Sequence, residues 1–277
     1  MIHVELMLAI FAGLAGLLIG SFLNVCIFRL PRDLSVVAPR SFCPECEGPI
    51  AWFDNIPLIS YLVLRARCRK CGKRIPLRYP LVELLTGAAF FFAVWGLGLT
   101  AVALKFCVFG AILITLVFSD LEERILPDEF TLGGTVVGIL FALIVPMQYN
   151  LMHLLLFSLR NPVLLSVAES VFAAGFCAGT LWFVGVLFKM IRHKEGLGFG
   201  DVKMVAMIGA FLGLQGTLLT LIVAALLGAI IGLSYIWFTG KDASTYELPF
   251  GTFLGTAALG VGFFGEVFWN WYSRLGA

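Results

Sequence analysis

The sequence predicts an all-α membrane protein with about eight transmembrane helices and one small cytoplasmic zinc-binding insert. Its 277 residues are 60% hydrophobic and only 13% charged, whereas soluble domains carry about 25% charged residues. Apolar stretches long enough to cross a bilayer recur along the whole chain. This composition excludes a soluble enzyme, and we expect the lipid bilayer, and no nucleic acid, among the partners of the chain.

The apolar stretches place candidate spans at roughly 5–28, 80–97, 101–120, 130–147, 164–189, 201–215, 217–239 and 251–272. The first is interpreted as a membrane helix and not as a cleaved signal peptide, because residues 1–5 contain no Lys or Arg and no small-residue cleavage site follows. The apolar segment 148–163 is short and is interrupted by Pro162. We therefore expect an interfacial helix there and not a ninth span.

The basic residues indicate which side of the membrane each loop occupies. Ten Lys and Arg lie between residues 29 and 78, and two later loops add Lys189, Arg192, Lys194 and Lys241. Cytoplasmic loops carry the excess of positive charge, so the segment after the first span faces the cytoplasm. We divide the chain into a first transmembrane helix (1–28), a cytoplasmic insert (29–79) and a polytopic membrane domain (80–277).

Four of the seven cysteines form two CxxC units, Cys43–Cys46 and Cys68–Cys71, with residues 47–67 between them. Such paired units suit a tetrahedral zinc site, because each short turn directs two thiolates at one ion. Two disulfides or a redox pair are the alternatives, and the reducing cytoplasm disfavours a structural disulfide. An insert of this size buries little core, so we expect the metal to supply its folding energy.

Two aspartates lie at the ends of predicted spans on the cytoplasmic side. Asp120 ends span 101–120 and Asp201 begins span 201–215, after the glycines Gly198 and Gly200. A carboxylate at membrane depth is costly and normally functional, and two carboxylates sharing a proton can hydrolyse a peptide bond. The alternative is a helix N-cap at Asp201 and a solvated loop residue at Asp120. Asp128 is a rival candidate, which we expect to cap span 130–147.

Short motifs along nearly the whole chain resemble those of one known family. The N-terminal motifs are Gly20-Ser-Phe-Leu-Asn-Val, Arg29-Leu-Pro, CPEC, Asp54-Asn-Ile-Pro-Leu-Ile-Ser, CRKC and Arg78-Tyr-Pro-Leu-Val-Glu-Leu-Leu-Thr. The C-terminal motifs are Ser119-Asp120, Leu126-Pro127-Asp128, Glu195-Gly-Leu-Gly-Phe-Gly-Asp201-Val-Lys203 and Leu248-Pro-Phe-Gly-Thr-Phe-Leu. Together and in this order they resemble the bacterial type IV prepilin peptidases, which are GxGD-type aspartyl proteases.

The resemblance implies a bacterial inner-membrane protease with Asp120 and Asp201 as the catalytic pair. Its substrates would be prepilins and the pseudopilins of type II secretion, cut on the cytoplasmic side after a Gly. Family members with the cysteine insert typically also methylate the new N-terminal amine with S-adenosylmethionine, but the sequence assigns no residue to that cofactor. Thr252 stands where the family often has Pro, which we expect to alter the substrate-facing loop and not the catalytic pair.

Other residues are weaker candidates for contact with substrate. Acidic residues follow Asp120, and they would attract a basic leader peptide because opposite charges attract across short distances. The candidate substrate-binding residues are Gly198, Gly200, Lys203, Glu122, Glu123, Pro249, Phe250 and Gly251, with Glu195 as a further acid. Glu83 is either a contact for methyl transfer or a charge at a helix N-terminus.

Two other classes of function are compatible with parts of the pattern. A transporter with a zinc-ribbon domain would place charged or broken-helix sites near the bilayer midplane, often in repeated halves. Neither feature is evident from the sequence, in which no segment of 20–50 residues repeats. A non-catalytic assembly factor for secretion would not need both aspartates.

Overall fold

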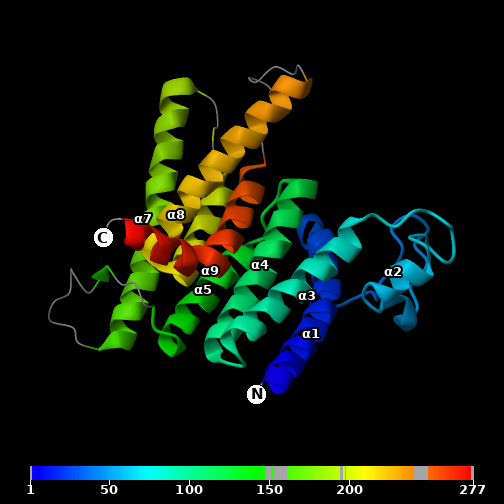
Figure 1. Ribbon diagram of the computed structural model, residues 1–277. Helices are drawn as coiled ribbons and strands as arrows, with labels where there is room; N and C mark the ends of the chain where they lie inside the picture. The colour runs from blue at the N-terminus through cyan, green and yellow to red at the C-terminus, as the bar shows by residue number, and fades with distance from the viewer. Residues whose placement is uncertain are drawn as a thin grey trace. The chain divides into compact units, whose positions relative to one another are not determined.

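The computed structural model describes residues 2–147, 151–152, 161–193, 196, 198–239 and 249–275. These residues form helices and loops, with isolated β-bridges but no β-strand among them. The longer helices are α1 (Ile2–Arg29), α3 (Arg78–Leu97), α4 (Ala101–Glu123), α5 (Asp128–Ile144), α7 (Pro162–Arg192), α8 (Phe199–Thr239) and α9 (Phe250–Leu275) (Figure 1). The short elements η1 (Leu30–Arg32), η2 (Trp52–Asn55) and α2 (Ile59–Val63) belong to the predicted insert.

Five of the described helical stretches are long and apolar enough to cross a membrane, and Phe250–Gly265 is a shorter apolar stretch. The five are His3–Arg32, Arg78–Leu97, Ala101–Glu123, Pro162–Arg192 and Phe199–Gly232. This confirms the predicted all-α membrane class. Of the interfacial segment expected at 148–163, the structure describes only residues 151–152 and 161–163, and the last two of these begin α7.

The predicted spans 201–215 and 217–239 are the two parts of α8, which breaks at Gly213 (φ 70°, ψ −176°). This left-handed φ suits glycine, because a Cβ would clash with the backbone. The break is stabilised by Glu169 of α7, which is fully buried and accepts hydrogen bonds from the amides of Leu214 (3.0 Å) and Met152 (3.1 Å). The carboxylate thus satisfies an amide that the break leaves without a helical partner.

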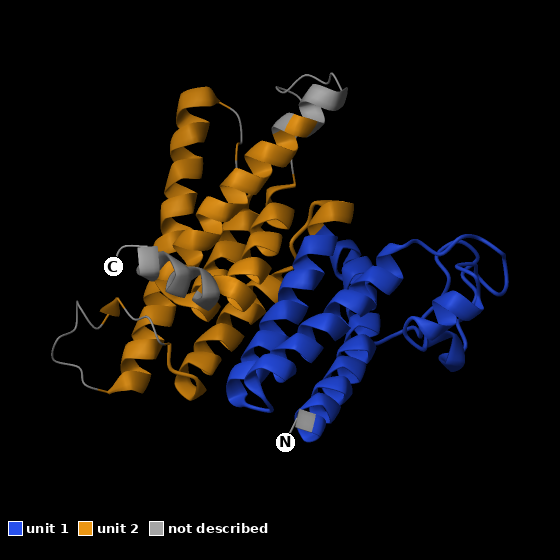
Figure 2. Ribbon diagram, viewed as in Figure 1, with its two compact units in different colours: residues 1–119 blue, residues 120–277 orange. Residues whose placement is uncertain are grey.

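The chain forms two compact units, Met1–Ser119 and Asp120–Ala277, whose boundary falls within α4 (Figure 2). In the N-terminal unit α1 packs closely on α3: a Cβ on Gly20 would lie only 2.7 Å from the Cα of Glu83. In the C-terminal unit α8 packs against α5, α7 and α9. The three-segment domain division made from the sequence stays a prediction, and its insert (29–79) lies wholly within the N-terminal unit.

Candidate functional site

The four CxxC cysteines come together in the N-terminal unit. Their Sγ atoms all lie within 4.8 Å of one another, and those of Cys43 and Cys71 are 3.9 Å apart. Two thiolates on a tetrahedral zinc ion, with Zn–S bonds of about 2.3 Å, lie about 3.8 Å apart. All four thiols are free, whereas a disulfide would bring two sulfurs to about 2.0 Å. The cluster therefore fits a metal ion.

The two CxxC turns share one backbone pattern. The amide of Cys43 donates to the carbonyl of Gly48 (3.0 Å), and that of Cys68 donates to Lys73 (2.8 Å). The residue after each second cysteine, Glu47 or Gly72, donates back to the first cysteine (2.8 and 2.9 Å) and has a positive φ. This local repeat was missed from the sequence, because beyond the cysteines the two turns share only an isoleucine.

Within the cluster, Cys68 favours the thiolate form that binds metals, whereas at Cys71 a backbone hydrogen bond from Lys73 is outweighed by desolvation and by hydrogen bonds with the other thiols, which raise its pKa to about 11. Hydrogen bonds from the backbone N–H groups of Cys71 and Lys70 lower the pKa of the Cys68 thiol to about 7. An ordinary cysteine is mostly protonated at neutral pH. Cys68 is therefore partly ionised at neutral pH even before a cation adds its own attraction.

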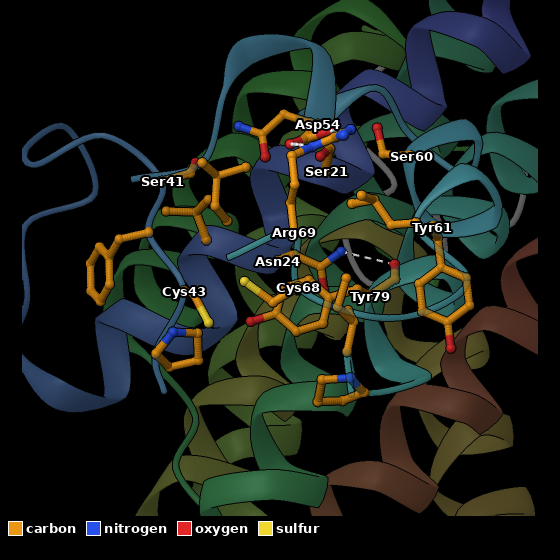
Figure 3. A pocket seen from close by; sticks show the side chains of 18 of the residues that line it. Ser21, Asn24, Ser41, Cys43, Asp54, Ser60, Tyr61, Cys68, Arg69 and Tyr79 are labelled. Atoms are coloured by element: carbon orange, nitrogen blue, oxygen red, sulfur yellow. Dashed lines mark hydrogen bonds and ion pairs between the residues drawn. The ribbon is translucent and has the colours of Figure 1, made fainter. Parts of the chain in front are cut away.

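A cavity of about 590 Å³ adjoins this cluster within the N-terminal unit. The end of α1, the start of α3 and the cysteine-bearing segment form its walls, and Figure 3 shows Cys43 and Cys68 on one side of it. Arg69 stabilises another part of the cavity wall, because it donates two hydrogen bonds to Asp54, at 2.9 and 2.7 Å. The guanidinium holds the pKa of the Asp54 carboxyl below its usual value.

Asn24 and Arg29 of α1 and Glu83 of α3 are buried polar side chains in the wall of this cavity. Asn24 is 2% exposed and its Nδ2 donates to the carbonyl of Tyr79 at 3.0 Å, while its Oδ1 has no partner among the described residues. Glu83 does not lie in the first turn of α3, so its expected role as a helix N-terminal charge is wrong. Its Oε2 instead accepts the amide of Leu58 at 2.9 Å, which ties the insert to α3.

The two predicted catalytic aspartates both lie in the C-terminal unit and are buried, with 6% of Asp120 and 9% of Asp201 exposed. Asp120 is in the last turn of α4, and Asp201 is in the first turn of α8. Thr252, in the first turn of α9, donates both its amide (2.6 Å) and its hydroxyl (2.8 Å) to Asp120 Oδ2. The expectation that Thr252 would affect only the substrate-facing loop is wrong, because it binds the carboxylate directly.

The first turns of α8 and α9 meet the end of α4 at these acids. A Cβ on Gly251 would lie 3.0 Å from Asp120 Cγ, and the Leu126 side chain would be 3.1 Å from that Cβ and 3.2 Å from one on Gly200. Gly200 immediately precedes Asp201, and the two carboxylates are close enough to repel one another. Three helix ends therefore bring the acidic pair together.

The weaker candidate residues for substrate binding differ in their contacts and in their burial. Gly198 accepts the Asp201 amide at 3.1 Å, and Pro249 and Phe250 lead half-buried into α9. Lys203 forms a 2.6 Å ion pair with Asp128, which is a first-turn residue of α5 and does not cap it as expected, since Pro127 holds that position. Glu122 is exposed and Glu123 half-buried beside Asp120, whereas Glu195 lies outside the described residues.

Two buried polar residues were not singled out from the sequence, Asn24 in the N-terminal unit and Glu169 in the C-terminal unit. A signal existed for both, since a polar or acidic residue inside an apolar span normally has a structural or functional reason. The unpartnered oxygen of Asn24 could not be predicted, because it is a property of the packed helices.

Comparison with known proteins agrees with these features. Residues 14–97 match the bacterial peptidase A24 N-terminal domain, and residues 107–233 match the type IV leader peptidase family. A protein of Legionella pneumophila is 36% identical over 94% of this chain and 92% of its own length, and one of Pseudomonas aeruginosa is 34% identical over 88% and 86%. One of Myxococcus xanthus is 40% identical over 86% of this chain and 66% of its own length.

All three relatives are named prepilin leader peptidase/N-methyltransferase. No solved structure matches the chain significantly. The two family matches follow one another along the chain, and the relatives extend over most of it, in agreement with the resemblance seen in the motifs. The chain belongs to the type IV leader peptidase family.

Proposed function

We propose that this chain is a multi-pass inner-membrane aspartyl peptidase that removes the leader of type IV prepilins and pseudopilins after a Gly. We further propose that it methylates the new N-terminal amine with S-adenosylmethionine. The observation that carries the first part is the buried pair Asp120 and Asp201 at the junction of three helix ends. Its position at helix ends, and not inside repeated halves, does not favour a transporter.

In this proposal the two aspartates share one proton and hydrolyse the peptide bond together. Asp120 acts as the general base, because the two donors of Thr252 favour the ionised form of its carboxylate. Asp201 carries the proton and donates it to the scissile carbonyl oxygen while Asp120 takes a proton from the attacking water, whose oxygen bonds to the carbonyl carbon. When the C–N bond breaks, Asp120 passes its proton to the leaving amine and a hydroxyl of the tetrahedral intermediate returns a proton to Asp201, which restores the starting state.

The reaction would take place at the cytoplasmic face. The basic residues between 29 and 78 indicate that the insert is cytoplasmic, and the predicted topology places the end of α4 and the start of α8 on that side. Gly198, Gly200, Pro249, Phe250 and Gly251 would form the approach for the substrate backbone. Lys203 would act mainly by holding Asp128, since the two already form an ion pair.

The four clustered thiols would hold one structural Zn²⁺. Cys43, Cys46, Cys68 and Cys71 fill all four tetrahedral positions, which leaves none for a reacting ligand. When bound, the ion supplies folding energy to an insert whose regular structure is limited to single turns. The ion would join the two CxxC turns, since each turn contributes two of the four cysteine ligands.

Leader cleavage by purified full-length protein tests the peptidase proposal. We expect Asp120→Asn and Asp201→Asn each to lower the cleavage rate by roughly 10³-fold or more, which is typical of losing a general acid or base. Asp128→Asn is the matched control, because it neutralises an exposed aspartate of the same unit that pairs with Lys203. Cleavage by either variant at the rate of this control would contradict the assignment.

A further inference from the structure

The relatives are named for two activities, and the proposed acidic pair accounts for one of them. Among the described residues, the N-terminal unit contains a cavity of about 590 Å³ between α1, α3 and the insert. We propose that this cavity binds the sulfonium methyl donor and is the site of methyl transfer to the N-terminal amine. This inference rests on the proposed methyltransferase function and adds where the reaction occurs and which residues hold the donor.

The cavity has the size and lining that a nucleoside cofactor requires. Small-molecule sites usually enclose about 300–1,000 Å³ and combine apolar walls with a few fixed polar groups. Here Phe22, Val25 and Phe42 contribute apolar and aromatic surface, and Ser21 and Tyr79 contribute hydroxyl groups. Figure 3 shows Ser21, Asn24 and Tyr79 around one space, with side chains from α1 and from the start of α3.

Asn24 supplies an acceptor that the protein itself leaves unused. Its Nδ2 is held by the carbonyls of Tyr79 (3.0 Å) and Gly20 (3.3 Å), so the orientation of the amide is fixed. Its Oδ1 is buried on the cavity wall with no partner in the described part of the chain. Buried oxygens are nearly always hydrogen-bonded, so this one is suited to an N–H donor of a ligand, such as the amino group of the donor molecule.

Glu83 supplies the negative charge that a sulfonium cation needs. It is 8% exposed, lines the cavity and pairs with no basic side chain among the described residues. The other carboxylates in the wall, Asp54 and Glu45, already face basic partners, Arg69 at 2.7 Å and Lys73 at 3.4 Å. A buried carboxylate without a cation is costly, and a positively charged ligand beside it would remove that cost.

The cysteine cluster forms part of the same wall, since Cys43 and Cys68 both line the cavity. An ion bound by these thiols would fix the wall without taking part in the reaction. The transfer itself is balanced without a redox partner. The lone pair of the unprotonated amine forms an N–CH₃ bond, the S–CH₃ bond breaks, and its electron pair returns to sulfur. The positive charge passes from sulfur to the methylated nitrogen, which later loses a proton to water.

Binding of S-adenosylmethionine to purified full-length protein, measured by equilibrium dialysis, tests this location without relying on turnover. We expect Glu83→Gln to weaken binding at least tenfold, although its side-chain oxygen can still accept the Leu58 amide. Ser21→Leu, which places a larger side chain in the cavity and removes the hydroxyl that bonds Glu83, should weaken binding to a similar degree. Glu5→Gln is the matched control, because this exposed acid of α1 lies outside the cavity.

Metal content and leader cleavage are measured on the same samples, so that a misfolded variant is recognised. If the wild type binds and transfers methyl groups while Glu83→Gln and Ser21→Leu retain its affinity, the cavity is not the site, although the methyltransferase function stands. If the wild type neither binds the donor nor methylates a cleaved pilin, the proposed function fails and this inference fails with it. Weaker binding in both cavity variants, with cleavage and metal content preserved, supports the location.

Discussion

The two sites of this molecule are built in opposite ways. The acidic pair stands on the ends of long helices, which fix its position by packing against one another. The cysteine cluster lies on two short turns in a segment with only brief helical elements, so its position would depend on the proposed zinc ion. A substitution in the acidic pair should therefore change the structure only locally, whereas loss of a cysteine ligand should disturb the fold of the whole N-terminal unit.

Loss of the metal should have a large effect on the N-terminal unit and a small one on leader cleavage. We expect chelation, or Cys68→Ser, to unfold segment 29–79 and to lower S-adenosylmethionine affinity by about 100-fold or more, because structural zinc supplies about 10–16 kcal/mol to small domains. Leader cleavage should change far less, because Asp120 and Asp201 belong to the other unit. Metal analysis and limited proteolysis measure the first change, and peptide assays measure the second.

The matched control is Cys177→Ser, which alters a buried cysteine of α7 away from the cluster. It should leave metal content unchanged. Less than about half an equivalent of any metal in the purified wild-type protein would contradict the proposed metal site, because Cys₄ sites bind zinc tightly. Equal loss of cleavage and methyl transfer in Cys68→Ser would show that the cluster supports the whole chain.

Glu169 tests whether the helix framework of the acidic pair depends on one buried carboxylate. Glu169→Ala leaves the amides of Leu214 and Met152 without their acceptor. An unsatisfied buried donor costs about 1–3 kcal/mol, so we expect a lower thermal midpoint and slower cleavage. Glu129→Ala, which alters an exposed acid of α5, is the control for loss of charge. An unchanged midpoint for Glu169→Ala would mean that the break at Gly213 needs no such support.

Thr252 tests the hydrogen bonds to the proposed base. Thr252→Val removes the hydroxyl donor to Asp120 and keeps the amide donor. A hydrogen bond to a charged group contributes about 1.5–3 kcal/mol, so we expect kcat/KM to fall roughly 10-fold or more, with Thr252→Ser close to wild type. Thr256→Val is the control, since that hydroxyl bonds only a carbonyl of its own helix. If both Val variants behave alike, the Thr252 hydroxyl has no role in catalysis.

The smallest effect concerns the acids that follow Asp120. Replacing Glu122 and Glu123 together by Gln should raise KM for a basic leader a few-fold at low salt and less at high salt, because exposed charge contacts are weak and screened. The kcat should hardly change, since these contacts are equal in the ground and transition states. A leader without Lys or Arg is the control. A KM that stays constant at low ionic strength would exclude the acids from substrate binding.

The sequence predicts those parts of both sites that depend on local pattern. The CxxC spacings determine the cluster, because each turn closes over only a few residues. The membrane helices follow from apolar stretches, although the break in α8 depends on the φ of Gly213 and on Glu169 of another helix. The hydrogen bonds from Thr252 to Asp120 join residues 132 positions apart, so they could not be read from local pattern.

The most direct test of the central claim, that two separate units perform the two reactions, is methylation of an already cleaved pilin by the Asp201→Asn variant. The assay supplies the mature pilin and S-adenosylmethionine and measures methyl transfer to the N-terminal amine. We predict a rate within about twofold of wild type, because the variant leaves the cavity beside Asn24 and Glu83 intact. Loss of methyl transfer in this variant, with the same protein still binding the donor, would contradict the claim.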